Sequence, residues 1–265
     1  INWDYCPKTL TEINLSNNQI KEMNWDYCPD ITRNLIRIDL SYNKITDMNW
    51  KGCPVILSRI DLSYNKIKRI NWEYCPQNLT EISLSRNKIK EINWKGCPGH
   101  LTCIFLDSNK IQELNWKECP NTLTLIFLRY NQIKELNWKE SSENLTNIDL
   151  SYNKIQEINW ENCPRNLTTI DLRYYKFQEL HVINWKYVPW NINTFNSDDL
   201  MIKYNEYKKS RNNIPDLPWV SQARKSLIHE IDYISILPPK ILTLKIFKQG
   251  GYRFRESIQE MGLVY

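Results

Sequence analysis

Short stretches of alternating apolar and polar residues recur along the chain. In the segment LTEISLSRNKIKEI, from Leu79 to Ile92, the apolar Ile82 and Leu84 alternate with polar residues, and two further isoleucines follow. A period of two places the apolar side chains on one face of a strand. The pattern therefore predicts a short strand around residues 81–84, then a turn, then a return segment whose isoleucines also point into the core.

The same unit fills the first two thirds of the chain. The leucine before each predicted strand lies at Leu10, Leu35, Leu57, Leu79, Leu101, Leu123, Leu145 and Leu167. Tryptophans recur at Trp3, Trp25, Trp50, Trp72, Trp94, Trp116, Trp138, Trp160 and Trp185, in six steps of 22 residues and two of 25. A fixed period in this range is typical of solenoids, whose units bury their apolar faces against one another. One strand per circuit predicts a parallel sheet along the solenoid.

The pattern L-x-x-I-x-L-x-x-N-x-I-x-x-I resembles the leucine-rich repeat family over about residues 1–185. The short arm CPxxL is similar to the compact repeats of bacterial effectors and of some large DNA viruses. The resemblance implies an α/β repeat fold, a right-handed solenoid with a parallel concave sheet and a mostly irregular convex side. Its usual role is protein–protein recognition.

Two recurrent residue types have positions that favour a role in the scaffold. An asparagine recurs at the turn that leaves each strand, where its amide can satisfy backbone groups that the turn would bury unpaired. These asparagines are Asn18, Asn43, Asn65, Asn87, Asn109, Asn131 and Asn153. The tryptophans stand between two core positions, which favours hydrophobic filling over the alternative of an exposed aromatic stripe for a ligand.

Seven of the eight cysteines share one position in the repeat: Cys6, Cys28, Cys53, Cys75, Cys97, Cys119 and Cys163. Parallel side chains on neighbouring coils have poor geometry for disulfides. No CxxC pair is present and the chain has three histidines, which disfavours zinc. We therefore expect buried free thiols, no metal and no cofactor, with disulfides or a bound metal as the alternatives. Free thiols favour an intracellular setting, the cytoplasm or the particle of a virus.

The strand positions that face solvent differ from coil to coil, and function can vary there. The position between the two inward residues is Asn14, Asp39, Asp61, Ser83, Phe105, Phe127, Asp149 and Asp171. The position before the inward isoleucine includes Cys103 and Leu125, and a row at the strand exit holds Tyr42, Tyr64, Tyr130, Tyr152 and Tyr174. We predict an apolar centre of Cys103, Phe105, Leu125 and Phe127, flanked by aspartates and edged by tyrosines. Such a patch favours partner binding, with coverage by the tail or by self-association as the alternative.

The remaining residues, 186–265, are expected to form a small, mainly helical segment. We predict helices over residues 198–211, 220–234 and 253–261 and an apolar strand or buried segment over residues 241–247. Tyr175 stands where the eighth unit should carry its asparagine, so the solenoid is expected to end near Trp185 to Trp190. A cap on the open end of the solenoid is the favoured role of the tail, and a separate docking module is the alternative.

Charge and motifs narrow the function further. The net charge is +5, and residues 186–265 carry 12 basic and 8 acidic residues, which leaves 23 against 22 in the repeats. That balance disfavours a nucleic-acid groove. No apolar run is long enough to span a bilayer, and no catalytic motif is present. The chain begins at Ile1 inside a repeat, so we expect it to be part of a longer protein, and secretion stays open.

We therefore predict a non-enzymatic module that binds a protein partner of unknown identity on its concave face. The alternative is a structural component of a larger assembly, such as a viral particle or scaffold, held by homotypic or assembly contacts. Deleting residues 191–265 would help to separate the two. An adaptor should keep its partner, whereas an assembly component should lose its incorporation.

Overall fold

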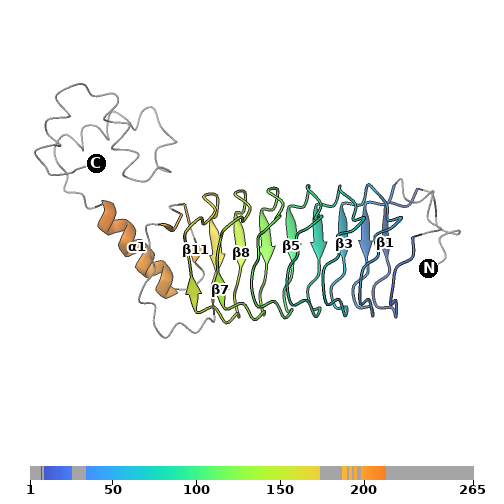
Figure 1. Cartoon of the computed structure of the whole chain (residues 1–265), viewed down its shortest axis with the longest axis horizontal. Helices are drawn as coiled ribbons and strands as arrows, with labels where there is room; N and C mark the ends of the chain where they lie inside the picture. The colour runs from blue at the N-terminus through green and yellow to red at the C-terminus, as the bar shows by residue number, and fades with distance from the viewer. Residues whose placement is uncertain are drawn as a thin grey trace, which may run out of the picture. The chain divides into compact units, whose positions relative to one another are not determined.

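The computed structural model describes residues 7, 9–25, 34–173, 187–189, 191–192, 194–195 and 198–212. The chain divides into two compact units, Ile1–Met201 and Ile202–Tyr265, and each is described by itself. The first unit is a solenoid with one strand per coil (Figure 1). The boundary expected after residue 185 stays a prediction.

The solenoid carries one parallel sheet of nine strands. Its strands are β1 Glu12–Asn14, β2 Arg37–Asp39, β3 Arg59–Asp61, β4 Glu81–Ser83, β5 Cys103–Phe105, β6 Leu125–Phe127, β8 Asn147–Asp149, β10 Thr169–Asp171 and β11 Thr194–Phe195, side by side in that order. Neighbouring strands pair without a shift along the repeat, so that Ile82 lies beside Ile60 and Ile104. The parallel solenoid predicted from the repeat is confirmed.

The core is a column of identical side chains. The central isoleucine of each strand and the leucines on either side point inward, as the period-two pattern requires. Ile82, Ile104 and Ile126 are fully buried, as are Leu79, Leu101 and Leu123. Because each coil covers the apolar face of the coil before it, the 22-residue unit has a core only as part of the stack.

The sheet continues one strand beyond the end expected at residues 185–190. β11 pairs with β10, placing Thr194 beside Thr169 and Phe195 beside Ile170. Phe195 is 1% exposed and packs edge-on against Trp160, with ring centroids 5.9 Å apart. Phe195 therefore fills the core position that an isoleucine holds in the other coils.

The segment before β11 also follows the backbone pattern of the repeat, although its residues differ. In the preceding coil Cys163-Pro164 is followed by Leu167, whose N–H donates to the Pro164 carbonyl at 3.1 Å. In the last coil Val188-Pro189 is followed by Ile192, whose N–H donates to the Pro189 carbonyl at 3.3 Å. Val188 and Ile192 are both buried, so other apolar residues take the places of the cysteine and the leucine.

The convex side is built mainly from turns. Two short strands, β7 Glu135–Leu136 and β9 Glu157–Ile158, form a second parallel pair there. The described tryptophans, from Trp25 to Trp160, are buried, and the indole N–H groups of the first five link neighbouring coils. The Nε1 atoms of Trp25, Trp50, Trp72, Trp94 and Trp116 donate to the carbonyl of the asparagine before the next tryptophan, at 2.6–2.8 Å.

The cysteines that the structure describes are free thiols: Cys53, Cys75, Cys97, Cys103, Cys119 and Cys163. Burial raises the pKa of the Cys75, Cys97 and Cys163 thiols, and it raises that of Cys119 to about 12. Cys6 and Cys28 lie outside the described residues. The column serves as small apolar filler beneath the convex turns.

The helix predicted over residues 198–211 is present as α1, Asp198–Asn212. The helices expected over residues 220–234 and 253–261 and the apolar segment at residues 241–247 lie outside the described residues. In the described part of the chain, no helix combines the length and the apolar character needed to cross a membrane. The role of the tail as a cap stays a prediction.

Candidate recognition surface

The solvent-facing side of the sheet, called the sheet face below, has an aromatic centre. Phe105 on β5 and Phe127 on β6 are adjacent and half-buried, with ring centroids 4.8 Å apart and planes 5° apart. Leu125 beside them is half-buried, whereas Cys103 is only 7% exposed. The predicted apolar centre is thus brought together, with the two rings as its accessible part.

The aspartates that share this strand position stabilise the turn that follows. In β2, β3 and β8 the Oδ1 atom of the aspartate accepts a hydrogen bond from the backbone N–H of the serine two residues ahead. The pairs are Ser41 to Asp39, Ser63 to Asp61 and Ser151 to Asp149, at 2.8–2.9 Å. Such side-chain acceptors satisfy a donor that the turn leaves unpaired. These aspartates therefore belong to the scaffold as well as to the surface.

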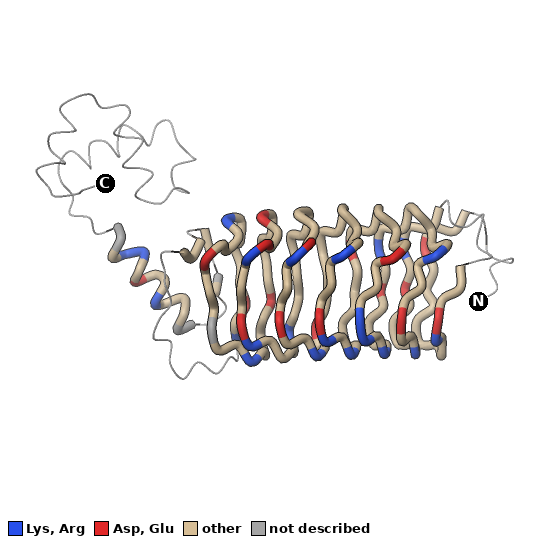
Figure 2. Tube along the Cα trace, in the orientation of Figure 1, with Lys and Arg blue, Asp and Glu red and all other residues tan. Residues whose placement is uncertain are grey.

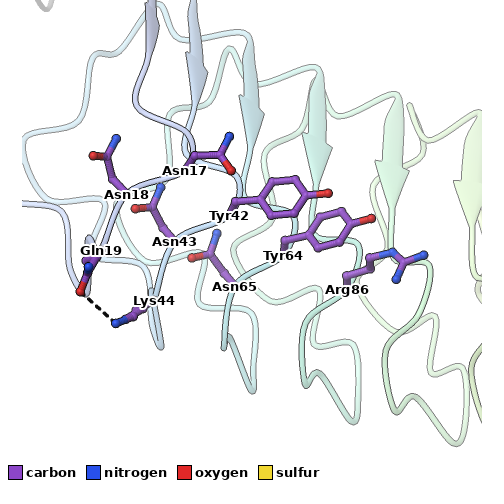
Figure 3. Close-up of a pocket in the computed structure, with 9 residues that line it drawn as sticks. All are labelled: Asn17, Asn18, Gln19, Tyr42, Asn43, Lys44, Tyr64, Asn65 and Arg86. Carbon is purple, nitrogen blue, oxygen red and sulfur yellow. Dashed lines mark hydrogen bonds between the residues drawn. The ribbon is translucent and has the colours of Figure 1, made fainter.

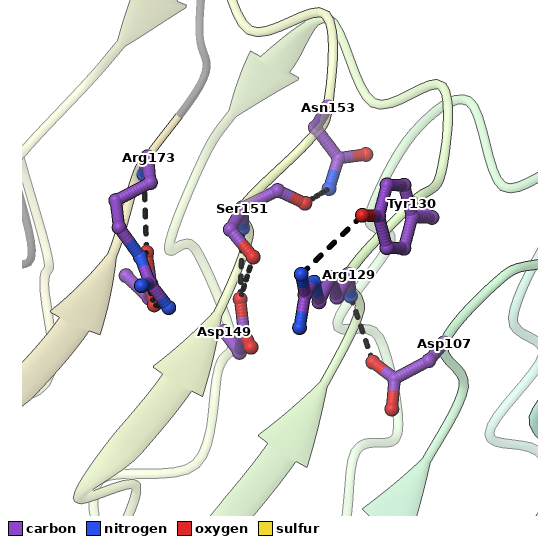
Figure 4. Close-up of polar contacts among 8 residues, drawn as sticks. Asp107, Arg129, Tyr130, Asp149, Ser151, Asn153 and Arg173 are labelled. Atoms are coloured by element: carbon purple, nitrogen blue, oxygen red, sulfur yellow. Dashed lines mark hydrogen bonds and ion pairs between the residues drawn. The ribbon is translucent and has the colours of Figure 1, made fainter.

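Asp171 makes a stronger contact of the same kind. Its Oδ1 accepts the Arg173 N–H at 3.0 Å, and its Oδ2 lies 2.6 Å from the Arg173 Nη2 (Figure 4). Asp171 is 5% exposed, so its carboxylate is held beneath the arginine. The carboxylate of Asp171 is therefore less accessible to a partner than its solvent-facing strand position predicts.

In the coil of Phe127 the backbone N–H of the turn has a different acceptor. Phe127 cannot accept a hydrogen bond, and Asp107 of the preceding coil replaces it by accepting the Arg129 N–H at 2.9 Å (Figure 4). Burial, opposed by this hydrogen bond and supported by the charge of Asp149, raises the pKa of Asp107 to about 6. A carboxyl group that titrates near pH 6 therefore lies beside the aromatic centre.

A row of tyrosines follows the strands at one edge of the sheet face. Tyr42 and Tyr64 stack with centroids 3.9 Å apart, and Tyr130 and Tyr152 lie 4.2 Å apart. Their backbones are left-handed, with φ of 53–56°, which favours glycine or asparagine over bulky residues. Tyr174, the last of the predicted row, lies outside the described residues.

Arginines extend both tyrosine pairs. Arg86 lies over the Tyr64 ring at 4.9 Å, and Arg129 lies over the Tyr130 and Tyr152 rings at 4.8 and 4.9 Å. Tyr42 and Tyr130 remain 48% and 46% exposed. Each stack is therefore a rigid amphipathic block at the rim of the sheet face.

An open groove of about 570 Å³ runs below the first stack (Figure 3). Tyr42, Tyr64 and Arg86 line one side, Gln19 and Lys44 line the other, and asparagines lie between them. The groove places aromatic, cationic and amide groups within reach of one ligand.

The asparagines at the strand exits bridge neighbouring coils. The Nδ2 of Asn65 donates to the Leu40 carbonyl of the coil before at 2.9 Å and to Leu62 and Ser63 of its own coil, while its Oδ1 accepts the Ile45 N–H at 2.9 Å. Asn43, Asn87, Asn109, Asn131 and Asn153 repeat this set with their own neighbours, and Asn18 donates within its own coil. We call this column the asparagine ladder.

Sequence reasoning did not assign Asp107 and Arg129 to the surface, nor did it single out Arg86 and Arg173. Asp107, Arg129 and Arg173 share one repeat position that is serine in the coils of β2, β3, β4 and β8, and this departure was the available signal. Among the described residues no cluster of histidine, cysteine, aspartate or glutamate could hold a metal ion.

Comparison with known proteins places this architecture among leucine-rich repeat folds. A family model described as "Leucine Rich repeat" matches residues 6–21. A search of curated proteins finds no match to the sequence.

Several solved structures are similar. YopM from Yersinia enterocolitica aligns at 22% identity with a TM-score of 0.50, over 71% of this chain and 41% of that one. The leucine-rich effector YopM from Yersinia pestis aligns at 22% and 0.55, over 71% and 48%. The Toll–Spatzle complex of Drosophila aligns at 20% and 0.56, over 63% and 24%. This chain spans less than half of each, and at these identities the likeness shows the leucine-rich repeat fold alone.

Proposed function

We propose that this chain is a non-enzymatic recognition module that binds a protein partner on the sheet face, the concave side in leucine-rich repeat proteins. The observation that carries the proposal is the parallel stack of Phe105 and Phe127 at strand positions that are polar in the other described coils. Large aromatic residues at the centre of a surface, ringed by polar groups, are typical of interface hot spots.

The aromatic pair lacks the local function of the residues it replaces. Asp39, Asp61 and Asp149 each accept a backbone N–H of the following turn, and a phenylalanine at the same position cannot. Half-buried rings on the solvent side also leave apolar area in contact with water. A partner that covers the rings would gain the free energy of removing that area from water.

The surroundings of the pair support a protein ligand. The tyrosine–arginine stacks provide rigid contact area with little loss of side-chain entropy on binding. Charges of both signs, such as the Arg59–Glu81 pair at 3.5 Å, lie nearby and would set orientation more than affinity.

A recognition role fits the state of the thiols better than a catalytic one. Burial raises the pKa of Cys103, the thiol of the sheet face, to about 11, so that it is protonated at neutral pH. The thiolate is the nucleophilic form of cysteine, which makes Cys103 a poor nucleophile. We assign it to packing beside the aromatic centre.

The test is affinity purification from the native source with three versions of the chain. The double variant F105S/F127D places at each position a residue that the repeat already uses there, as at Ser83 and Asp61. We expect it to lose the partners of the wild-type chain by at least about tenfold in recovered amount, since a central hot spot contributes about 2 kcal/mol or more.

The matched control is V55D, because Val55 is a 68% exposed apolar residue of a convex turn. V55D should recover the wild-type partners. Equal recovery by the double variant and the wild type, at matched thermal stability, would show that the sheet face is not the binding surface. Deletion of residues 191–265 tests the alternative. If the chain enters a large assembly and the deletion abolishes this incorporation, the chain is an assembly component.

A further inference from the structure

A column of lysines runs along the edge of the solenoid where the strands end. Lys44, Lys66, Lys88, Lys110 and Lys154 directly follow the asparagine ladder, and all five are exposed. Gln19 and Gln132 hold the same position in the two described coils that lack the lysine. We call the five residues the lysine ladder; Figure 2 shows basic segments along the lower edge of the solenoid.

Backbone hydrogen bonds hold the lysine ladder in line. The N–H groups of Lys44, Lys66, Lys88, Lys110 and Lys154 donate to the carbonyls of Ile20, Ile45, Ile67, Ile89 and Ile133 of the preceding coils, at 2.8–2.9 Å. Successive lysines are therefore spaced like the strands, about 4.8 Å apart. The charges are fixed in a straight row by the fold, while their long side chains keep some reach.

The lysines of the ladder form no ion pair with the described part of the chain. The Nζ of Lys44 donates to the Gln19 Oε1 at 3.0 Å, and the described residues provide neither a hydrogen bond nor an ion pair to the Nζ atoms of Lys66, Lys88, Lys110 and Lys154. Like charges at this spacing repel one another. A ligand with negative charges in a matching row would remove that repulsion.

A second row of charges runs beside the first. Three positions after the first four lysines of the ladder come Asp47, Arg69, Glu91 and Glu113, all exposed, and Glu135 holds the same place in the coil of Gln132. Figure 2 shows a row of mostly acidic segments next to the basic segments of the lower edge. The edge thus presents two parallel rows of opposite sign.

We propose that the lysine ladder binds an α-helix of a partner protein that carries one acidic residue per turn. A helix repeats its surface every 5.4 Å, and residues four apart lie on one face. The three steps from Lys44 to Lys110 span about 14 Å and three helical turns about 16 Å, a difference that lysine side chains absorb. A basic stripe beside the acidic one would meet Asp47, Glu91 and Glu113.

The second row argues against nucleic acid as the ligand. A phosphate backbone carries charge of one sign throughout, and the four acidic residues of the second row would repel it. A helix can present acidic and basic stripes side by side, and so matches both rows. This inference does not depend on the aromatic centre of the sheet face.

The test uses the full chain and a labelled model helix of about 18 residues, roughly 27 Å long. Its alanine-rich sequence has one glutamate stripe beside one lysine stripe, and a scrambled peptide of equal composition spreads these charges around the helix. Fluorescence anisotropy at low salt should show at least about tenfold tighter binding of the striped peptide, since several aligned ion pairs add up.

The ladder variant K66Q/K88Q/K110Q should lose about tenfold in affinity for the striped peptide, and each single variant about twofold to threefold. Glutamine at this position is already accepted at Gln19 and Gln132, and tryptophan fluorescence with a thermal melt would check the fold. The matched control K95Q/K117Q/K139Q removes three exposed lysines from the opposite turn of the coils and should bind like the wild type. The aromatic variant F105S/F127D should also bind the striped peptide normally.

Two results would overturn the proposal. Equal binding of striped and scrambled peptides, or an equal loss in the control variant, would mean that the lysines act only through total charge. Tighter binding of oligothymidylate than of the striped peptide through the same lysines would identify a nucleic-acid site instead.

Discussion

The coils of β2 and β3 and the coils of β5 and β6 have the same scaffold and different surfaces. Asn65 and Asn109 make the same four kinds of hydrogen bond, and Ile60 and Ile104 occupy the same core position. On the sheet face, however, Asp39 and Asp61 stand in the first pair and Phe105 and Phe127 in the second.

This difference separates residues that stabilise the coil from residues at solvent-facing positions that do not. The aspartates accept a hydrogen bond from the turn of their own coil, so a surface position contributes to the scaffold. The phenylalanines give up that contact, and Asp107 restores it for one of the two coils. The same backbone therefore tolerates a phenylalanine at a position where other coils carry an acceptor for the turn.

The largest expected effect tests whether the two regions share one scaffold. Replacing Asn65 or Asn109 by alanine removes all their side-chain hydrogen bonds and leaves buried backbone groups unpaired. Each variant should lower the free energy of unfolding by about 3 kcal/mol or more. Urea unfolding followed by tryptophan fluorescence measures it, with Lys110→Ala as a neighbouring exposed control of small effect. Clearly unequal losses would show that the aromatic coils have their own scaffold.

The second prediction concerns the carboxyl group found only in the aromatic region. The pKa of Asp107 is raised to about 6 from 3.8, so the folded chain binds this proton more tightly than the unfolded chain. Its contribution to stability is full below about pH 4 and is lost as the pH rises through 6. Asp107→Asn should remove this dependence and raise the free energy of unfolding at pH 7 by about 1–2 kcal/mol, because an amide can still accept the Arg129 N–H.

Urea titrations at pH 4, 5, 6 and 7 compare the two chains, and carboxyl NMR would follow Asp107 directly. Asp149→Asn is the paired control, because the charge of Asp149 helps to raise the pKa of Asp107. That variant should move the midpoint of the pH dependence downward. Parallel stability profiles for the wild type and Asp107→Asn would contradict the prediction.

A third prediction addresses the polar region. Asp61→Ala leaves the Ser63 N–H without its side-chain acceptor and should cost about 1 kcal/mol, the usual effect of removing such a cap. Ser83→Ala is the matched substitution at the same strand position, where the side chain has no described hydrogen bond to the following turn. Thermal unfolding should separate the two, and equal melting temperatures would remove the structural role given to the aspartates.

The smallest expected effect lies on the opposite turn of the same coils. Gly52 and Gly96 are left-handed there, with φ of 80° and 79°, and Glu118 and Glu140 have the same conformation at φ 65°. Since glycine adopts it without strain, Glu118→Gly should stabilise the chain by about 0.5–1 kcal/mol and Gly96→Glu should destabilise it similarly. Differential scanning calorimetry would resolve the signs. A loss of stability in Glu118→Gly would mean that its side-chain contacts outweigh the backbone strain.

Much of this fold could be predicted because its determinants recur. The spacing of Leu79, Ile82 and Asn87 predicts a strand and the turn that follows it. A single such segment would be ambiguous, but eight copies of it are not. The last coil was missed because Val188, Ile192 and Phe195 keep the apolar volume of the repeat without its letters. Core packing depends on the volume and shape of a side chain, whereas a repeat pattern is defined by residue type.

The surface was less predictable for a related reason. The alternation of each strand indicates that Phe105 faces outward, and the structure agrees. That Asp61 accepts a turn N–H, or that Asp107 reaches across to Arg129, depends on side-chain conformation and on the spacing between coils. The left-handed backbone of Tyr42 and Tyr64 is likewise set by the turn, against the ordinary preference of tyrosine.

The indole hydrogen bonds have a consequence for how the solenoid responds to force. From Trp25 to Trp116 each indole fastens its coil to the next, whereas the Nε1 atoms of Trp138 and Trp160 are buried without a partner among the described residues. A load applied along the solenoid would be resisted by an indole bond at each of the earlier junctions and by the β7–β9 pair between the coils of β6 and β8. Among the described residues, the junction after Trp160 has neither. We expect extension to begin by separating the coil that follows Trp160, so that this end of the solenoid unfolds first under load.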